Sequence, residues 1–137
     1  MRTVFADAGY WIALLNPLDE LHNRAMELSK SLAPVRIVTS EMVLTECLNY
    51  FAERGPNLRR TAVALVRKLQ EDPNIDVIPQ TALLFQSALA RYDDRDDKRW
   101  SHTDCASFLA MKEKDISEAF AHDIHFEQAG FKALLRQ

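Results

Sequence analysis

The chain has 137 residues, of which 47% are hydrophobic, and it carries 17 basic against 20 acidic residues for a net charge of −3. This composition is that of a globular protein and not of a disordered one, and the charge balance argues against a strongly basic, non-specific nucleic-acid binder. The length suits one domain that folds without disulfide support, so we expect a single domain over residues 1–137.

The cysteines and the longest apolar runs bear on location. Cys47 and Cys105 form no C-x-x-C pair and lie in apolar helical patterns, which indicates buried, reduced thiols. The sequence shows no signal-peptide pattern, and no apolar run approaches the ~20 residues of a membrane span. We therefore expect a cytoplasmic protein that makes no membrane contact.

Short β-type runs alternate with helical patterns along the chain. Strands are predicted at residues 4–6, 35–39, 75–79, 118–122 and 131–135. Helical patterns cover 20–33, a segment that begins behind Thr39 or Ser40 and stops at Gly55, and then 58–69, 81–92 and 101–115. The alternation predicts a three-layer α/β/α sandwich around a mostly parallel sheet of about five strands.

The stretch "TVFADAGYWIALLN" places Asp7 between two apolar segments. An unpaired buried carboxylate costs several kcal/mol, or its pKa rises until it is neutral. Asp7 therefore either caps a helix or pairs with a cation. In parallel α/β sheets ligands bind beyond the carboxyl ends of the strands, and both Asp7 and Asp123 directly follow predicted strands. We expect both acids at that edge.

Two further acids lie within helical patterns. Glu46 shares a mostly apolar helix face with Met42, Val43 and Tyr50, which is unusual company for a solvated glutamate. Asp104 lies three residues after Ser101, so it fits a capping box. Capping and metal binding are compatible roles for Asp104, because one carboxylate oxygen can serve the cap while the other faces an ion.

Histidines and basic residues near these acids admit simpler explanations. The run "HDIH" suggests zinc through His122 and His125, but a third nitrogen or sulfur ligand is missing, which disfavours zinc. The run "DDRDDKRW" over residues 93–100 reads as a solvated loop without the spacing of a calcium loop. Its cations, Arg95, Lys98 and Arg99, are candidates for phosphate contacts.

Four segments in order resemble the PIN domain, and most closely the VapC-type ribonucleases of bacterial toxin–antitoxin pairs: "FADAGYWIALL", "TSEMVLTECLNYF", "WSHTDCASFLAM" and "EAFAHDIHFEQAGF". The acids of that family fall on Asp7, Glu46, Asp104 and Asp123. Ser101 or Thr103 falls where the family often has a hydroxyl beside the third acid. The last motif departs from the family, because His122 stands where a small residue often precedes Asp123.

The resemblance implies hydrolysis of RNA phosphodiester bonds with Mg²⁺ or Mn²⁺ as cofactor. Four carboxylates in one cleft repel one another unless a cation offsets them, and oxygen ligands select hard ions over zinc. On this hypothesis Asp7 and Asp104 bind the ion directly, and Glu46 and Asp123 complete the site or orient water. A homodimer and a small antitoxin protein that blocks the cleft are further implications of the resemblance.

Two other classes compete with a nuclease. A catalytically silent PIN-fold scaffold would keep the fold and bind RNA or protein, but it has no need of all four acids. A phosphoacceptor receiver domain also carries acids at a strand edge, usually as a pair after the first strand. Here Asp7 is followed by Ala8 and Gly9, which disfavours that class.

Overall fold

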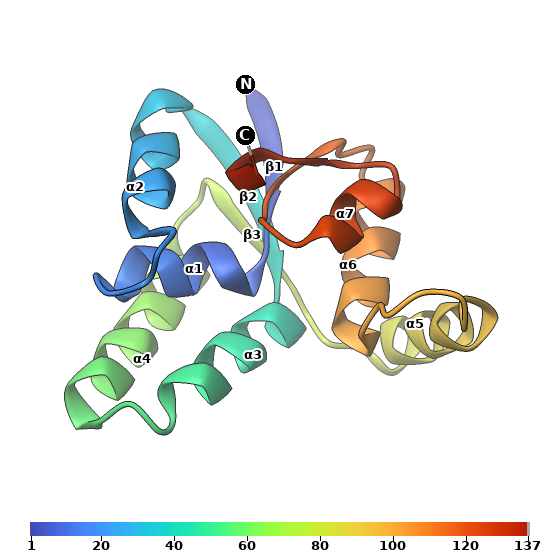
Figure 1. The fold of residues 1–137 in the computed structure, drawn as a ribbon, viewed down its shortest axis with the longest axis horizontal. Helices are drawn as coiled ribbons and strands as arrows, with labels where there is room; N and C mark the ends of the chain where they lie inside the picture. Colours follow the sequence, from blue (N-terminus) through green and yellow to red (C-terminus); the bar gives the residue numbers. More distant parts are fainter. Residues whose placement is uncertain (137) are drawn as a thin grey trace.

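The computed structural model describes residues 1–136, which form one five-stranded sheet in the order β3-β2-β1-β4-β5 (Figure 1). Every pair of neighbouring strands is parallel. The elements in chain order are β1 (Arg2–Ala6), α1 (Ala8–Leu15), α2 (His22–Ser31), β2 (Val35–Ser40), α3 (Glu41–Phe51), α4 (Pro56–Glu71), β3 (Ile75–Ile78), α5 (Ala82–Asp94), α6 (His102–Glu113), β4 (Glu118–Phe120), α7 (Ile124–Gln128), β5 (Lys132–Ala133) and the 3₁₀ turn η1 (Leu134–Arg136).

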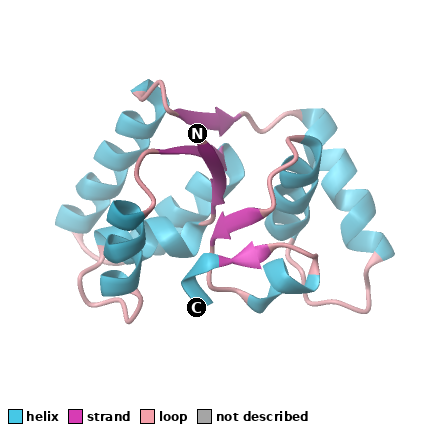
Figure 2. Cartoon of the chain, turned by 90° about the horizontal axis from the view of Figure 1, so that it is seen from above, coloured by secondary structure: helices cyan, strands magenta, loops and turns pink. Residues whose placement is uncertain are grey.

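Helices cover both faces of the sheet. Helices α1 to α4 pack together on one side, and α5, α6 and α7 pack together on the other (Figures 1 and 2). The central strand β1 is buried on both faces, since Val4, Phe5 and Ala6 have no exposed surface. This arrangement confirms the three-layer sandwich predicted from the alternation of strands and helices.

Aromatic pairs join a helix to the sheet on one side and two helices to each other on the other side. The ring of Tyr10 on α1 stacks on Phe120 of β4 with centroids 4.4 Å apart. On the other side, Phe108 of α6 meets Phe126 of α7 edge to face at 5.0 Å. Such pairs contribute about 0.5–1.5 kcal/mol beyond the area they bury. They hold α1, α6 and α7, the helices next to the carboxyl ends of β1 and β4, in fixed positions.

The predicted elements are all present, most of them with ends shifted by one or two residues, and the largest differences are in two places. Helix α3 ends at Phe51, well before Gly55, and Gly55 instead precedes α4 with φ of +91°, a conformation that favours glycine. Pro56 then occupies the first turn of α4, where its missing amide costs nothing. The predicted strand 131–135 is paired only over Lys132–Ala133, because the apolar Leu134 and Leu135 are buried by a 3₁₀ turn.

A buried chain of hydrogen bonds fixes the carboxyl ends of the central strands. The hydroxyl of Thr39, which has no exposed surface, donates to the carbonyl oxygen of Ala6 at 2.8 Å and accepts from the indole of Trp11 at 3.3 Å. The amide of Asp7 donates to the carbonyl oxygen of Phe120 at 3.1 Å. Strands β2, β1 and β4 are thereby tied together at one edge.

Within residues 1–136, every helix is too short or too polar to cross a lipid bilayer.

Replacing Thr39 with valine should lower the free energy of unfolding by about 1–3 kcal/mol, because the indole of Trp11 loses its buried acceptor. Urea denaturation measures this change. The matched control is Thr61→Val on α4, where the exposed hydroxyl bonds only the carbonyl oxygen of Asn57, and the expected change is within about 0.5 kcal/mol. Equal effects of the two substitutions would contradict the structural role of Thr39.

Candidate active site

The acids singled out from the sequence come from different elements that meet at one edge of the sheet. Asp7 follows β1, and Asp123 lies between β4 and α7. Glu46 lies on α3, which begins directly after β2, and Asp104 lies in the first turn of α6. Because the strands are parallel, their carboxyl ends share this edge, and residues far apart in the sequence come within electrostatic reach there.

Asp7 carries the clearest electrostatic signature of the site. The pKa of its carboxyl is raised to about 7, first by burial and then by the charges of Asp104, Glu46 and Asp123, while a hydrogen bond from the amide of Ala8 opposes the rise. Asp7 occupies the N-cap position of α1, but its side chain makes no capping hydrogen bond. Of the two explanations for a carboxylate at this position, pairing with a cation is therefore the one that the geometry favours.

Glu46 belongs to the same electrostatic group although its side chain reaches solvent. Partial desolvation raises the pKa of its carboxyl, and the charge of Asp104 raises it further. The structure thus brings together the acids at 7, 46, 104 and 123. With every member ionised they would repel one another, and a bound cation would offset that repulsion.

Asp104 is positioned by the capping box predicted from the sequence. The hydroxyl oxygen of Ser101 accepts from the amide of Asp104 at 2.9 Å, and Oδ2 of Asp104 accepts from the amide of Ser101 at 3.0 Å. Ser101 therefore supports the site through the backbone of α6. The side chain of Thr103 is half-buried and makes no hydrogen bond to the described part of the chain.

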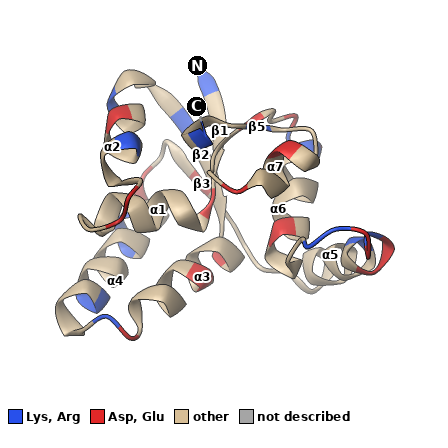
Figure 3. Ribbon diagram, viewed as in Figure 1, with Lys and Arg blue, Asp and Glu red and all other residues tan. Residues whose placement is uncertain are grey.

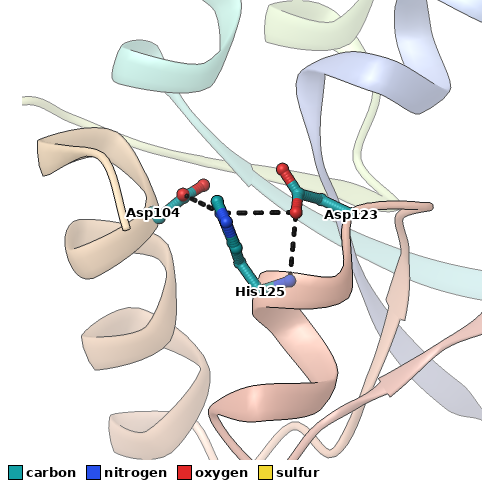
Figure 4. A group of neighbouring side chains, drawn as sticks. All are labelled: Asp104, Asp123 and His125. Carbon is teal, nitrogen blue, oxygen red and sulfur yellow. Dashed lines mark hydrogen bonds and ion pairs between the residues drawn. The ribbon is translucent and has the colours of Figure 1, made fainter. Parts of the chain in front are cut away.

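His125 is a site residue whose contacts the sequence analysis missed. Its Nδ1 atom lies 3.0 Å from Oδ2 of Asp104 and 3.3 Å from Oδ1 of Asp123 (Figure 4). The backbone amide of His125 also donates to Oδ1 of Asp123 at 3.0 Å. The signal in the sequence was the spacing Asp-x-His at a helix start, which the sequence analysis interpreted only as part of a zinc motif. The neighbouring His122 is exposed and lies outside this cluster.

The donor set fits a hard divalent cation. Carboxylate oxygens of Asp104 and Asp123 and a ring nitrogen of His125 lie within 4.8 Å of one another. The charges of these acids raise the pKa of Asp7, and the charge of Asp104 raises the pKa of Glu46. Carboxylate oxygens predominate, which suits Mg²⁺ or Mn²⁺ better than zinc. His122 is not part of the group, so the two histidines of "HDIH" do not form a zinc pair.

The loop between α5 and α6 carries basic residues and leads to the start of α6, the helix that carries Asp104 (Figure 3). A hollow of about 450 Å³ is lined by this loop and ends at Ser101, the cap of the helix that carries Asp104. Arg95 pairs with Asp97 at 3.0 Å and lies over the ring of Trp100, so its charge is partly engaged. Lys98 and Arg99 form no ion pair with the described residues.

Comparison with known proteins gives close relatives along nearly the whole chain, although no family model matches it. The chain is 34% identical over 131 residues to the 23S rRNA-specific endonuclease VapC20 of Mycobacterium tuberculosis, with the same identity to the protein from strains CDC 1551 and H37Rv. The match covers 93% of this chain and 95% of the relative.

Solved structures give the same result. The crystal structure of M. tuberculosis VapC20, described as a sarcin–ricin loop cleaving toxin, superposes with a TM-score of 0.83 at 32% identity and covers 93% of this chain and 95% of its own. FitAcB from Neisseria gonorrhoeae superposes with a TM-score of 0.65 at 15% identity over 95% of each chain, a likeness of fold alone.

The raised pKa of Asp7 predicts how the stability of the metal-free protein depends on pH. The folded protein keeps the Asp7 proton up to about pH 7, whereas the unfolded chain releases it near pH 4. Stability therefore falls as pH rises through this window, and the loss is complete above it. Asp7→Asn removes the ionisation, so its melting temperature in EDTA at pH 8 should exceed that of wild type by on the order of 5 °C.

At pH 4 the two proteins should melt at similar temperatures. At pH 8, Mg²⁺ added in place of EDTA should raise the melting temperature of wild type only. Asp93→Asn, an exposed substitution on α5 outside the acidic group, controls for the change of net charge and should show no such pH window. A difference between Asp7→Asn and wild type that did not change with pH, or an equal response to Mg²⁺, would remove Asp7 from the assigned role.

Proposed function

The chain belongs to the VapC family of PIN-domain nucleases, and from that premise we propose that it is an endoribonuclease that hydrolyses RNA phosphodiester bonds as the toxin of a toxin–antitoxin pair. The observation that carries the proposal is the convergence of Asp7, Glu46, Asp104 and Asp123 at one sheet edge, with the pKa of Asp7 raised to about 7. A scaffold without catalytic activity has no physical reason to retain this unfavourable charge cluster.

We propose that these four acids hold Mg²⁺ or Mn²⁺, with Asp7 and Asp104 binding the ion directly. When bound, such an ion offsets the charge of the scissile phosphate and lowers the pKa of an attacking water. Glu46, which reaches solvent beside Asp104, is placed to accept a proton from or orient that water. Asp123, half-exposed at the start of α7, completes the group on the side of β4.

The loop between α5 and α6 carries cations that lead to the start of α6, the helix of Asp104. Lys98 and Arg99 lie on the hollow that ends at Ser101, and we propose that they contact RNA phosphates together with Arg95. Tyr92 lines the same hollow and is 52% exposed, so its ring is available to stack on an unpaired base. RNA would thus approach the acids along the basic side of the hollow.

Ribosomal RNA is the substrate that we propose. The relative at 34% identity is a 23S rRNA-specific endonuclease, and its crystal structure is that of a toxin cleaving the sarcin–ricin loop. A site that combines phosphate-binding cations with an exposed aromatic ring suits an RNA loop whose bases are unstacked. Action on such RNA would take place in the cytoplasm.

Two protein partners belong to the proposal. The first is a second copy of the chain: α5 has only Ala88 fully buried and exposes Leu83, Phe85 and Leu89, an apolar face that a copy could cover. The second is a small antitoxin protein that blocks the acidic cleft until the toxin is released.

An RNA cleavage assay tests the activity. Wild type with Mn²⁺ or Mg²⁺ should cut ribosomal RNA into discrete products, and EDTA should abolish the cleavage. Asp104→Asn should abolish it as well, because the amide can keep the helix cap but cannot supply the anionic oxygen. Asp115→Asn, an exposed substitution between α6 and β4 outside the site and the hollow, is the control and should cleave like wild type. Cleavage in EDTA, or by Asp104→Asn at the wild-type rate, would contradict the proposed chemistry.

The RNA-contact proposal predicts a change in salt dependence. In an Asp104→Asn background, which binds RNA without cutting it, Lys98→Gln/Arg99→Gln should reduce the slope of log affinity against log salt by roughly 1.5, since each lost phosphate contact contributes about 0.7–0.9. The measurement is binding of an rRNA fragment over a series of KCl concentrations.

The charge-matched control is Lys30→Gln/Arg36→Gln, since both residues are exposed and Arg36 lies near the start of β2, at the opposite edge of the sheet. Its slope should equal that of the parent. Equal slopes for both double variants would show that the loop makes no phosphate contact.

A further inference from the structure

We propose that His125 is a positioning residue, which fixes the orientations of Asp104 and Asp123 so that one oxygen of each carboxylate is left for the cation. The inference rests on the proposed function only in taking these two acids to serve a metal-dependent nuclease. It assigns a role to the imidazole, which the chemistry of the four acids does not require.

The contacts of the ring determine where its proton lies. Nδ1 of His125 is 3.0 Å from Oδ2 of Asp104 and 3.3 Å from Oδ1 of Asp123. A nitrogen lone pair directed at two carboxylate oxygens would be repelled by both, so Nδ1 carries a hydrogen. The same donor is present in the neutral ring and in the imidazolium, and the bridge therefore does not depend on the protonation state of His125.

In each of the two carboxylates, one oxygen accepts hydrogen bonds and the other accepts none from the described residues. Oδ2 of Asp104 accepts from the amide of Ser101 at 3.0 Å as well as from the ring, and Oδ1 of Asp123 accepts from the amide of His125 at 3.0 Å. Within residues 1–136, Oδ1 of Asp104 and Oδ2 of Asp123 accept no hydrogen bond. These two oxygens are the ones left for a cation.

The ring is itself held in place by its surroundings. The backbone of His125 lies in the first turn of α7, which Asp123 caps. The next residue, Phe126, is fully buried against Phe108. The side chain of His125 is only 20% exposed. A donor held in this way keeps two like-charged groups from rotating apart, which lowers the cost of assembling them around an ion. Loss of such outer partners typically weakens metal affinity or activity by about 10–100-fold.

Three substitutions separate the hydrogen-bond donor from the ring. His125→Asn places an amide N–H near the position of Nδ1, His125→Phe keeps the ring without the donor, and His125→Ala removes both. The first readout is the Mn²⁺ dissociation constant by titration calorimetry on the full chain. We expect the alanine and phenylalanine variants to bind Mn²⁺ about 10–100-fold more weakly than wild type, and the asparagine variant to bind within a few-fold of it.

The second readout is the steady-state kinetics on an rRNA fragment. The alanine and phenylalanine variants should lose kcat at saturating Mn²⁺ while KM for RNA stays close to wild type, since no RNA contact is removed. His122→Ala is the matched control, because this exposed histidine lies three residues away and outside the cluster. Its Mn²⁺ affinity and kinetics should equal those of wild type.

Each other outcome overturns the inference. Wild-type Mn²⁺ affinity in both His125→Ala and His125→Phe would show that the bridge is not needed. Equal weakening in His125→Asn and His125→Ala would show that the donor is not what matters, as when the imidazole itself binds the ion. If the alanine variant does not fold, the asparagine–phenylalanine pair decides. Mn²⁺ binding that follows the expected pattern without RNA cleavage by wild type would refute the proposed function and leave the role of His125 standing.

Discussion

Repulsion between carboxylates held at one edge of a parallel sheet is the constraint around which this structure is organised. Parallel pairing places every strand's carboxyl end at the same edge, so acids that follow β1 and β4 necessarily approach each other. The pKa of Asp7, raised by burial and by its acidic neighbours, reports the cost of this arrangement. The surrounding hydrogen bonds keep the strand ends in place despite the repulsion between the carboxylates.

Hydrogen bonds between uncharged groups hold the strand ends together next to the acids. Thr39 ties the end of β1 to β2 and to the indole of Trp11, and the amide of Asp7 ties the same strand to β4. Around the acids the same principle recurs with charged acceptors, since Asp104 is held by the cap of α6 and Asp123 by the first turn of α7. Asp104 and Asp123 are thus oriented by backbone amides of their own helices before any ligand arrives.

Much of this was predictable from local patterns. Alternating strands and helices predicted the layers, and acids directly after strands predicted the edge at which they meet. The Ser101–Asp104 capping box was predictable because capping depends on residues three positions apart, and the structure confirms it. Sequence could not give the strand order, which is set by long-range packing, nor the short pairing of β5, where burial of Leu134 and Leu135 prevailed over strand propensity. His125 was missed for a similar reason, since its partner Asp104 lies far away in the chain. The catalytic and ligand roles of the acids stay predictions.

The order of the acids along the chain has a consequence for biosynthesis. Asp7 and Glu46 leave the ribosome before Asp123 and before the strand β5 that pairs with β4. Domains fold as units once enough of the chain has emerged. A nascent chain therefore carries an incomplete set of carboxylates while the segment from Asp123 to β5 is still inside the exit tunnel. For an enzyme proposed to cut ribosomal RNA, this order delays completion of the proposed site until that segment has emerged, and the ribosome that is translating the chain would be protected from it up to that point.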